Sequence, residues 1–205
     1  MTALWGPMGW MTLHSVSMLY PESPSAADRA ILKRYIELFR DTMTCIHCHN
    51  HFKGLYETYT RRHPDWANSK FNLFLFIARA HNAVNLRLNK PRPASVQECI
   101  TAFQSNTVVT SALTYRTKYI DYLLRTWARE MSGESMMKVS LVRELKRITE
   151  EYWNTKEEMG VRTFNMSADV FEYASDESSR PSVMSQITSQ QVNIGFKGGR
   201  LQLRR

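Results

Sequence analysis

Residues 45–62 read Cys-Ile-His-Cys-His-Asn-His-Phe-Lys-Gly-Leu-Tyr-Glu-Thr-Tyr-Thr-Arg-Arg, and this stretch joins a helical pattern to a pair of closely spaced cysteines. Its apolar residues recur every three or four positions, which predicts an amphipathic helix and not a strand. Thr42 or Thr44, just upstream, is suited to cap this helix. The side chains expected to face inward are Phe52, Leu55, Tyr56 and Tyr59.

Similar helical patterns flank this stretch on both sides, and none of them alternates as a strand would. Ser25 is suited to cap the helix that precedes the cysteines, and Pro91 and Pro93 close the strongly apolar helix that follows them. We therefore expect an all-α fold, arranged as an antiparallel helix bundle. The helices expected in this bundle span residues 4–20, 26–41, 45–62, 71–89 and 95–103.

The remainder of the chain differs from the bundle in pattern and composition. Apolar residues at helical spacing over 113–131 and 136–159 predict a helical hairpin, whereas the residues after 175 are mostly Ser, Gln, Gly and Arg. We expect three parts: a catalytic domain over 1–104, a helical extension over 105–174, and a flexible basic tail over 175–205.

Length and composition limit the classes of protein to which the chain can belong. With 205 residues, of which 43% are hydrophobic, it can form one core and a small second unit. The net charge of +8 includes five basic and no acidic residues over 178–205, so it implies a solvated tail and no specific nucleic-acid site. Neither a membrane-spanning run nor a signal peptide is recognisable, so we expect an intracellular soluble protein.

The Cys45-Ile46-His47-Cys48 pair has three possible roles when this segment is taken alone. Two thiols in the first turn of a helix lie close enough to oxidise, and the helix N-terminus stabilises a thiolate, which favours redox exchange. The neighbouring imidazoles of His47, His49 and His51 would also suit zinc, although a second distant ligand pair is missing. Inert core thiols are the third option.

Two further groups of residues favour a planar ligand. Trp10 and His14 lie four positions apart and thus share a helix face. In the second group, a histidine, a valine, an asparagine and a leucine share one face of the helix over 71–89, where buried polar side chains need partners. This second group consists of His81, Val84, Asn85 and Leu88.

Together these motifs resemble the Erv/ALR family of FAD-linked sulfhydryl oxidases over about residues 4–100. The resemblance implies a four-helix bundle with a short fifth helix, a homodimer, and FAD bound beside the disulfide. It also implies that a thiolate of a protein dithiol attacks Cys45, which releases Cys48 toward the flavin, and that dioxygen becomes hydrogen peroxide. The positions that match the FAD site of the family are Gly6, Trp10, His14, His51, His81, Asn82, Val84, Asn85, Leu88 and Lys90. Lys90 is suited to a phosphate of FAD.

The sequence departs from the family pattern at several places. Met43 stands where the family usually has an aromatic residue, and Phe76 where it usually has tryptophan. The shuttle cysteines of cellular members are absent, and Cys99 is expected to be a free thiol. In these respects the chain is most similar to the sulfhydryl oxidases of large cytoplasmic DNA viruses, which implies substrates in the host cytoplasm or virion and a thioredoxin-like carrier. A helical interaction module organised by zinc through Cys45, Cys48 and nearby histidines is the alternative.

Overall fold

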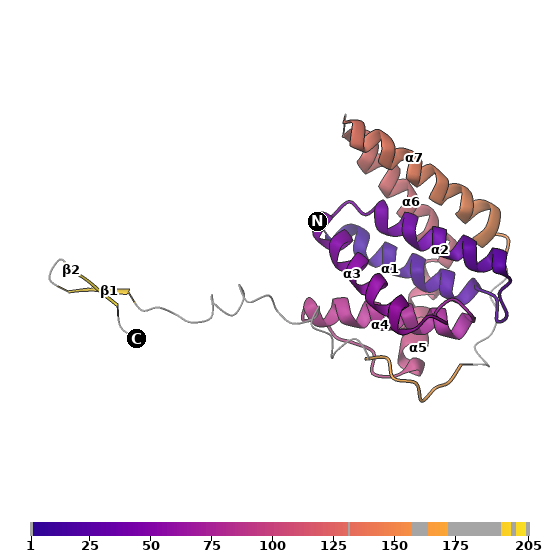
Figure 1. Ribbon diagram of the computed structural model, residues 1–205, viewed down its shortest axis with the longest axis horizontal. Coiled ribbons are helices and arrows are strands. Elements are labelled where there is room, and N and C mark those ends of the chain that lie inside the picture. Colours follow the sequence, from indigo (N-terminus) through magenta and orange to yellow (C-terminus); the bar gives the residue numbers. More distant parts are fainter. Residues whose placement is uncertain (1, 131, 157–163, 172–193, 198–199, 204–205) are drawn as a thin grey trace.

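A computed structural model describes residues 2–130, 132–156, 164–171, 194–197 and 200–203. The all-α fold predicted from the sequence is confirmed: helices account for most of the described residues (Figure 1). A short π-helical turn, η1 (Thr149–Trp153), follows the last of them. The helices are α1 (Thr2–Leu19), α2 (Ala26–Asp41), α3 (Ile46–Arg62), α4 (Lys70–Arg87), α5 (Val96–Val109), α6 (Ala112–Arg129) and α7 (Gly133–Ile148).

The ends of the helices follow local side-chain chemistry, with some differences from the expected bounds. Ser25 caps α2 through a capping box, as the sequence suggested. Neither Thr42 nor Thr44 caps α3; Cys45 does, because its sulfur accepts a hydrogen bond from the N–H of Cys48. Helix α4 ends at Arg87, two residues earlier than expected, since Asn89 takes a left-handed conformation with φ 52°.

Two other helices have different lengths from those expected. Helix α5 continues six residues beyond the expected end, to Val109, so it crosses the boundary placed at residue 104. Helix α7 begins at Gly133 and passes into η1 at Thr149, and the last part of the expected helix, residues 157–159, lies outside the described residues. The helical character of both segments follows from their apolar spacing, but the termini do not.

One hydrophobic core joins the bundle to the extension. Helix α6 lies along α1, and α7 lies along α2 (Figure 1). Phe39 of α2 stacks on Tyr119 of α6 with ring centroids 5.1 Å apart. At the surface, Arg34 of α2 donates two hydrogen bonds to the carboxylate of Glu144 on α7. The extension therefore completes the core of the bundle.

A second apolar cluster lies on the other side of α4, between this helix, α5 and the segment 164–171. Phe164 packs on Phe74 with ring centroids 4.8 Å apart. Arg79 donates from Nε to the carbonyl oxygen of Asp169 over 2.8 Å. This segment, although distant in sequence, is thus attached to α4.

Residues 194–197 and 200–203 lie in the segment predicted to be a flexible tail, yet they form strands β1 (Ile194–Lys197) and β2 (Arg200–Leu203). The strands pair antiparallel, with Ile194 opposite Leu203. The rest of the predicted tail falls outside the described residues. Among the helices that the structure describes, none is both long enough and apolar enough to cross a membrane.

Candidate active site

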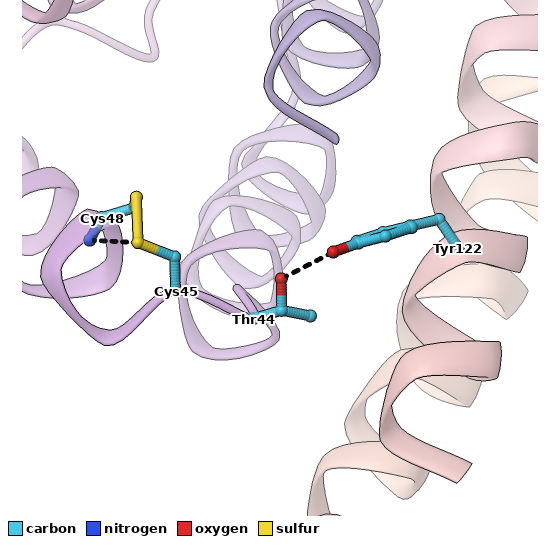
Figure 2. The surroundings of a disulfide bond; sticks show 4 residues. All are labelled: Thr44, Cys45, Cys48 and Tyr122. Atoms are coloured by element: carbon cyan, nitrogen blue, oxygen red, sulfur yellow. Dashed lines mark hydrogen bonds between the residues drawn. A yellow bond between two sulfur atoms is a disulfide. The ribbon is translucent and has the colours of Figure 1, made fainter. Parts of the chain in front are cut away.

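The two cysteines at the start of α3 form a disulfide, and their Cα atoms lie 5.2 Å apart. The N–H of Cys48 donates to Sγ of Cys45 over 3.2 Å (Figure 2). Both cysteines are partly exposed, and the side chain of Ile46 between them is 65% exposed. A sulfur that accepts a backbone hydrogen bond at a helix N-terminus is stabilised as a thiolate after reduction. The disulfide is thus open to a reacting thiol.

A cavity of about 380 Å³ lies against this disulfide, between α1, α3 and α4. Cys48 is part of its wall, whereas Cys45 is not among the lining residues. Eight of the ten residues predicted for the cofactor line it: Gly6, Trp10, His51, His81, Val84, Asn85, Leu88 and Lys90. The helical spacing in α1 and α4 explains this convergence, since residues three or four positions apart share a face.

His14, one of the two other predicted residues, lies behind the wall of the cavity. Its Nε2 is 3.0 Å from Nδ1 of His81, and His81 stacks on Trp10 with ring centroids 4.3 Å apart and an interplanar angle of 9°. His14 therefore does not contact the cavity directly. It helps to orient the ring of His81, which does line the cavity.

Asn82 is buried and also lies outside the cavity lining. Its Nδ2 donates to the carbonyl oxygens of Pro93 and Val170, each over 3.1 Å. The amide thus ties α4 to two neighbouring segments. Asn82 neighbours His81 in sequence but lies on a different face of α4, so the FAD contact that the family resemblance implies for Asn82 stays a prediction.

The imidazoles around the cavity are neutral at neutral pH. Burial lowers the pKa of His14 to about 4 and that of His51 to about 4. Burial, followed by the charge of His14, also lowers the pKa of His81 well below its ordinary value. Among the residues that line the cavity, positive charge therefore comes from Arg87 and Lys90, both of which are exposed.

Several lining residues were not predicted from the sequence. Arg87 lies three positions after Val84 on the same face of α4, so helical periodicity could have identified it. Asn106 could not be placed, because α5 was expected to end before it. The unpredicted lining residues are Trp5, Pro7, Met11, Phe39, Met43, Phe52, Arg87, Pro91 and Asn106.

The two positions that depart from the family pattern have different surroundings. Met43 lies at the cavity wall, so a methionine in place of the family's usual aromatic residue alters the surface that a ligand would meet. Phe76 is fully buried and packs against Phe52 and Trp66, with ring centroids 6.5 and 5.4 Å away. It is not a lining residue.

The histidines near the cysteines do not assemble a metal site. Nε2 of His49 lies 3.5 Å from the carboxylate of Asp41, and Nδ1 hydrogen-bonds Asn50. His51 faces the cavity, and His47 is exposed. Within the described residues, no group of three or more His, Cys, Asp or Glu side chains could hold a metal ion. The zinc alternative is therefore not favoured.

The cavity fits a planar aromatic ligand that carries an anionic group. Trp10 and Phe52 give it flat apolar walls, and Asn85 adds an amide. A Cβ added to Gly6 would meet no atom of a residue distant in the chain within 4 Å, so this part of α1 leaves open space beside the cavity. The exposed lining residues Arg87 and Lys90 would attract phosphates.

Proteins with similar sequences are named for a cofactor of this kind, FAD. A protein of Invertebrate iridescent virus 3, named as an FAD-linked sulfhydryl oxidase, is 36% identical over 93 residues, which are 45% of this chain and 61% of that protein. The mitochondrial FAD-linked sulfhydryl oxidase ERV1 of Saccharomyces cerevisiae is 31% identical over 42% of this chain and 44% of its own length. The African swine fever virus FAD-linked sulfhydryl oxidase is 28% identical over 42% of this chain and 69% of its own length.

The match spans less than two thirds of the length of the iridescent virus and yeast relatives. No solved structure matches the chain significantly. The model of the Erv1 / Alr family matches residues 7–108, which include α2 to α4, the disulfide and all of the residues that line the cavity except Trp5 and Gly6. Through these residues, the chain belongs to the Erv1 / Alr family.

Proposed function

We propose that the chain is an FAD-dependent thiol oxidase, which forms disulfides in protein substrates and reduces dioxygen to hydrogen peroxide. The observation that carries this proposal is the position of Cys48: it belongs to a partly exposed disulfide and also lines a cavity suited to a planar aromatic cofactor. The printed names of the relatives, each an FAD-linked sulfhydryl oxidase, support the same activity.

The disulfide begins the reaction by exchange. A substrate thiolate attacks Sγ of Cys45, so a bond forms between these two sulfurs while the Cys45–Cys48 bond breaks. Cys48 leaves as a thiolate at the cavity wall. The second thiolate of the substrate then attacks the substrate sulfur of the mixed disulfide and releases Cys45. The substrate loses two electrons, which the two cysteines now hold.

The lining residues would hold FAD by its different parts. Trp10, His81 and Val84 offer flat or apolar contacts to the ring system, and Lys90 and Arg87 offer positive charge to the phosphates. Bound FAD would take the two electrons from the dithiol and deliver them to dioxygen. Because His81 and His51 are neutral, they present no fixed charge to an electron-rich ring.

The partner that supplies electrons would be a protein dithiol, which we propose reaches Cys45 directly or through a thioredoxin-like carrier. Cys99 is buried, and burial raises the pKa of its thiol to about 11, so it is poorly suited to relay electrons. Viral relatives support a place in the host cytoplasm or the virion. A homodimer is part of the same proposal.

The test is an absorption spectrum of the purified protein together with a peroxide assay. We expect two flavin bands between about 300 and 600 nm, and one hydrogen peroxide formed for each disulfide made from added dithiothreitol. Cys99→Ser is the matched control and should turn over normally, since this thiol lies outside the cavity lining. A protein that stays colourless and inactive with added FAD would rule the oxidase out.

A further inference from the structure

We propose that α6 and α7, which lie beyond the matched family region, position the redox disulfide by holding residues 41–44, with Tyr122 and Trp127 as the positioning residues. The inference rests on the proposed function, because it assigns these two side chains a role in the thiol chemistry of Cys45 and Cys48. Asp41 is the last residue of α2, and residues 42–44 connect it to Cys45, the N-cap of α3, so the position of this segment decides where Cys45 lies.

Trp127 fixes the start of this connection. Its indole Nε1 donates to the carbonyl oxygen of Thr42 over 2.9 Å, and both residues are buried. A buried carbonyl without a partner costs on the order of 1–3 kcal/mol, so this hydrogen bond constrains the backbone. Lys138 of α7 reinforces it, because its Nζ lies 5.8 Å from the centre of the Trp127 ring and donates to the carbonyl oxygen of Asp41 over 2.7 Å.

Tyr122 fixes the end of the connection. Its hydroxyl lies 3.1 Å from Oγ1 of Thr44, the residue directly before Cys45 (Figure 2). Cys45 has extended backbone angles, φ −116° and ψ 108°, and not helical ones. Hydrogen bonds within α3 therefore do not fix its position alone, and the preceding residue contributes to it.

The same connection also shapes the cavity. Met43, between the two anchored residues, lines the cavity together with Cys48. Side chains of α6 and α7 thus act on the sulfur that accepts the N–H of Cys48 and on the wall beside it. If the anchors are lost, Cys45 should move from its capping position, and its thiolate should lose stabilisation in the reduced protein.

The experiment compares Tyr122→Phe and Trp127→Phe with two matched controls in the full chain. Tyr115→Phe removes a hydroxyl from α6 beside the second apolar cluster, seven residues before Tyr122. Trp153→Phe trims another buried indole of the extension, whose Nε1 has no hydrogen-bond partner among the described residues. The Trp153 control therefore reproduces the packing loss without touching residues 41–44.

Two measurements on the cysteines serve as readouts, and neither requires flavin or dioxygen. We expect iodoacetamide to alkylate the reduced Tyr122→Phe and Trp127→Phe variants about threefold more slowly at pH 7, because less thiolate is present. We also expect their disulfide to be harder to reduce in a glutathione redox buffer. The ratio of the squared concentration of reduced glutathione to the concentration of glutathione disulfide at which half of the protein is reduced should be about threefold higher than for the parent. Both controls should match the parent protein in both measurements.

Parent-like values for both test variants, or equal changes in the controls, would overturn the positioning role. If Trp127→Phe does not fold, Tyr122→Phe decides alone, since it removes only one oxygen. Failure of the proposed oxidase function would appear elsewhere, as a colourless protein without peroxide production.

Discussion

The bundle over α1–α5 and the extension over α6–η1 share one core but differ in what they contribute. The bundle holds the disulfide and every residue that lines the cavity. The extension supplies packing, through Tyr119, Leu123 and Trp153, and hydrogen bonds that reach residues 41–44. The difference teaches that chemistry can be confined to one region while the stability and geometry of that region depend on another.

The largest expected effect is the loss of activity when either cysteine of the bundle is replaced. Cys48→Ser and Cys45→Ser should each lower kcat/KM for dithiothreitol by at least about a thousandfold, because the exchange step loses a sulfur. The free energy of unfolding of both variants, measured under reducing conditions, should stay close to that of the parent. If either variant keeps more than a tenth of the parent activity, the bundle does not act through this disulfide.

The next effect tests whether the extension stabilises the bundle. Leu145→Ala on α7 removes a fully buried side chain, and we expect it to lower the free energy of unfolding by about 3 kcal/mol. Denaturant unfolding followed by circular dichroism and by tryptophan fluorescence should give one shared transition. Met137→Ala on the same helix is the control: it is 56% exposed and should change stability by less than about 0.5 kcal/mol. Separate transitions for the two probes would show that the regions unfold independently.

The buried histidines of the bundle predict a dependence of stability on pH. The folded pKa of His14 is about 4, below its unfolded value of 6.5, so between these values the unfolded chain binds more protons. Stability should therefore be complete above pH 6.5 and fall as the pH is lowered toward 4, by up to about 1.4 kcal/mol per pH unit for one such group.

Urea unfolding at pH 7 and pH 5 measures this effect. The difference in the free energy of unfolding between pH 7 and pH 5 should be smaller in His14→Gln than in the parent. In His47→Gln, a change at an exposed position, this difference should stay as in the parent. An equal difference between the two pH values in the parent and in His14→Gln would show that His14 is not buried as a neutral group.

The smallest expected effect is a difference in stability between two glycine variants of α1, one at the cavity and one at the core. A Cβ added to Gly6 meets no atom of a residue distant in the chain within 4 Å, while one added to Gly9 lies 3.3 Å from the rings of both Phe39 and Tyr119. Gly6→Ala should change the free energy of unfolding by less than about 1 kcal/mol, because the helix propensity of alanine is opposed by the contact of its Cβ with the ring of Pro7, the next residue. Gly9→Ala should be about 1–2 kcal/mol less stable than Gly6→Ala, because it strains the contact between bundle and extension. Thermal unfolding of the two variants measures the difference.

The sequence predicts the bundle well because its information is local. Periodicity places Trp10 on α1 and His81, Val84 and Asn85 on α4, and all four line the cavity. The hydrogen-bond partners of Asn82, the carbonyl oxygens of Pro93 and Val170, could not be predicted, since tertiary packing brings them to this side chain. The anchoring of Thr44 by Tyr122 joins residues 78 positions apart, and no local pattern encodes such a pair.

Anaerobic titration with dithiothreitol, followed by the flavin absorption bands, tests most directly the claim that Cys45 and Cys48 pass electrons to the cavity. We predict that the bands of the parent protein bleach fully and return when air is admitted, while those of Cys48→Ser, which keeps the other lining residues, stay unbleached over the same time. Bleaching of Cys48→Ser at the rate of the parent would contradict the account, because electrons would then enter the cavity without this cysteine.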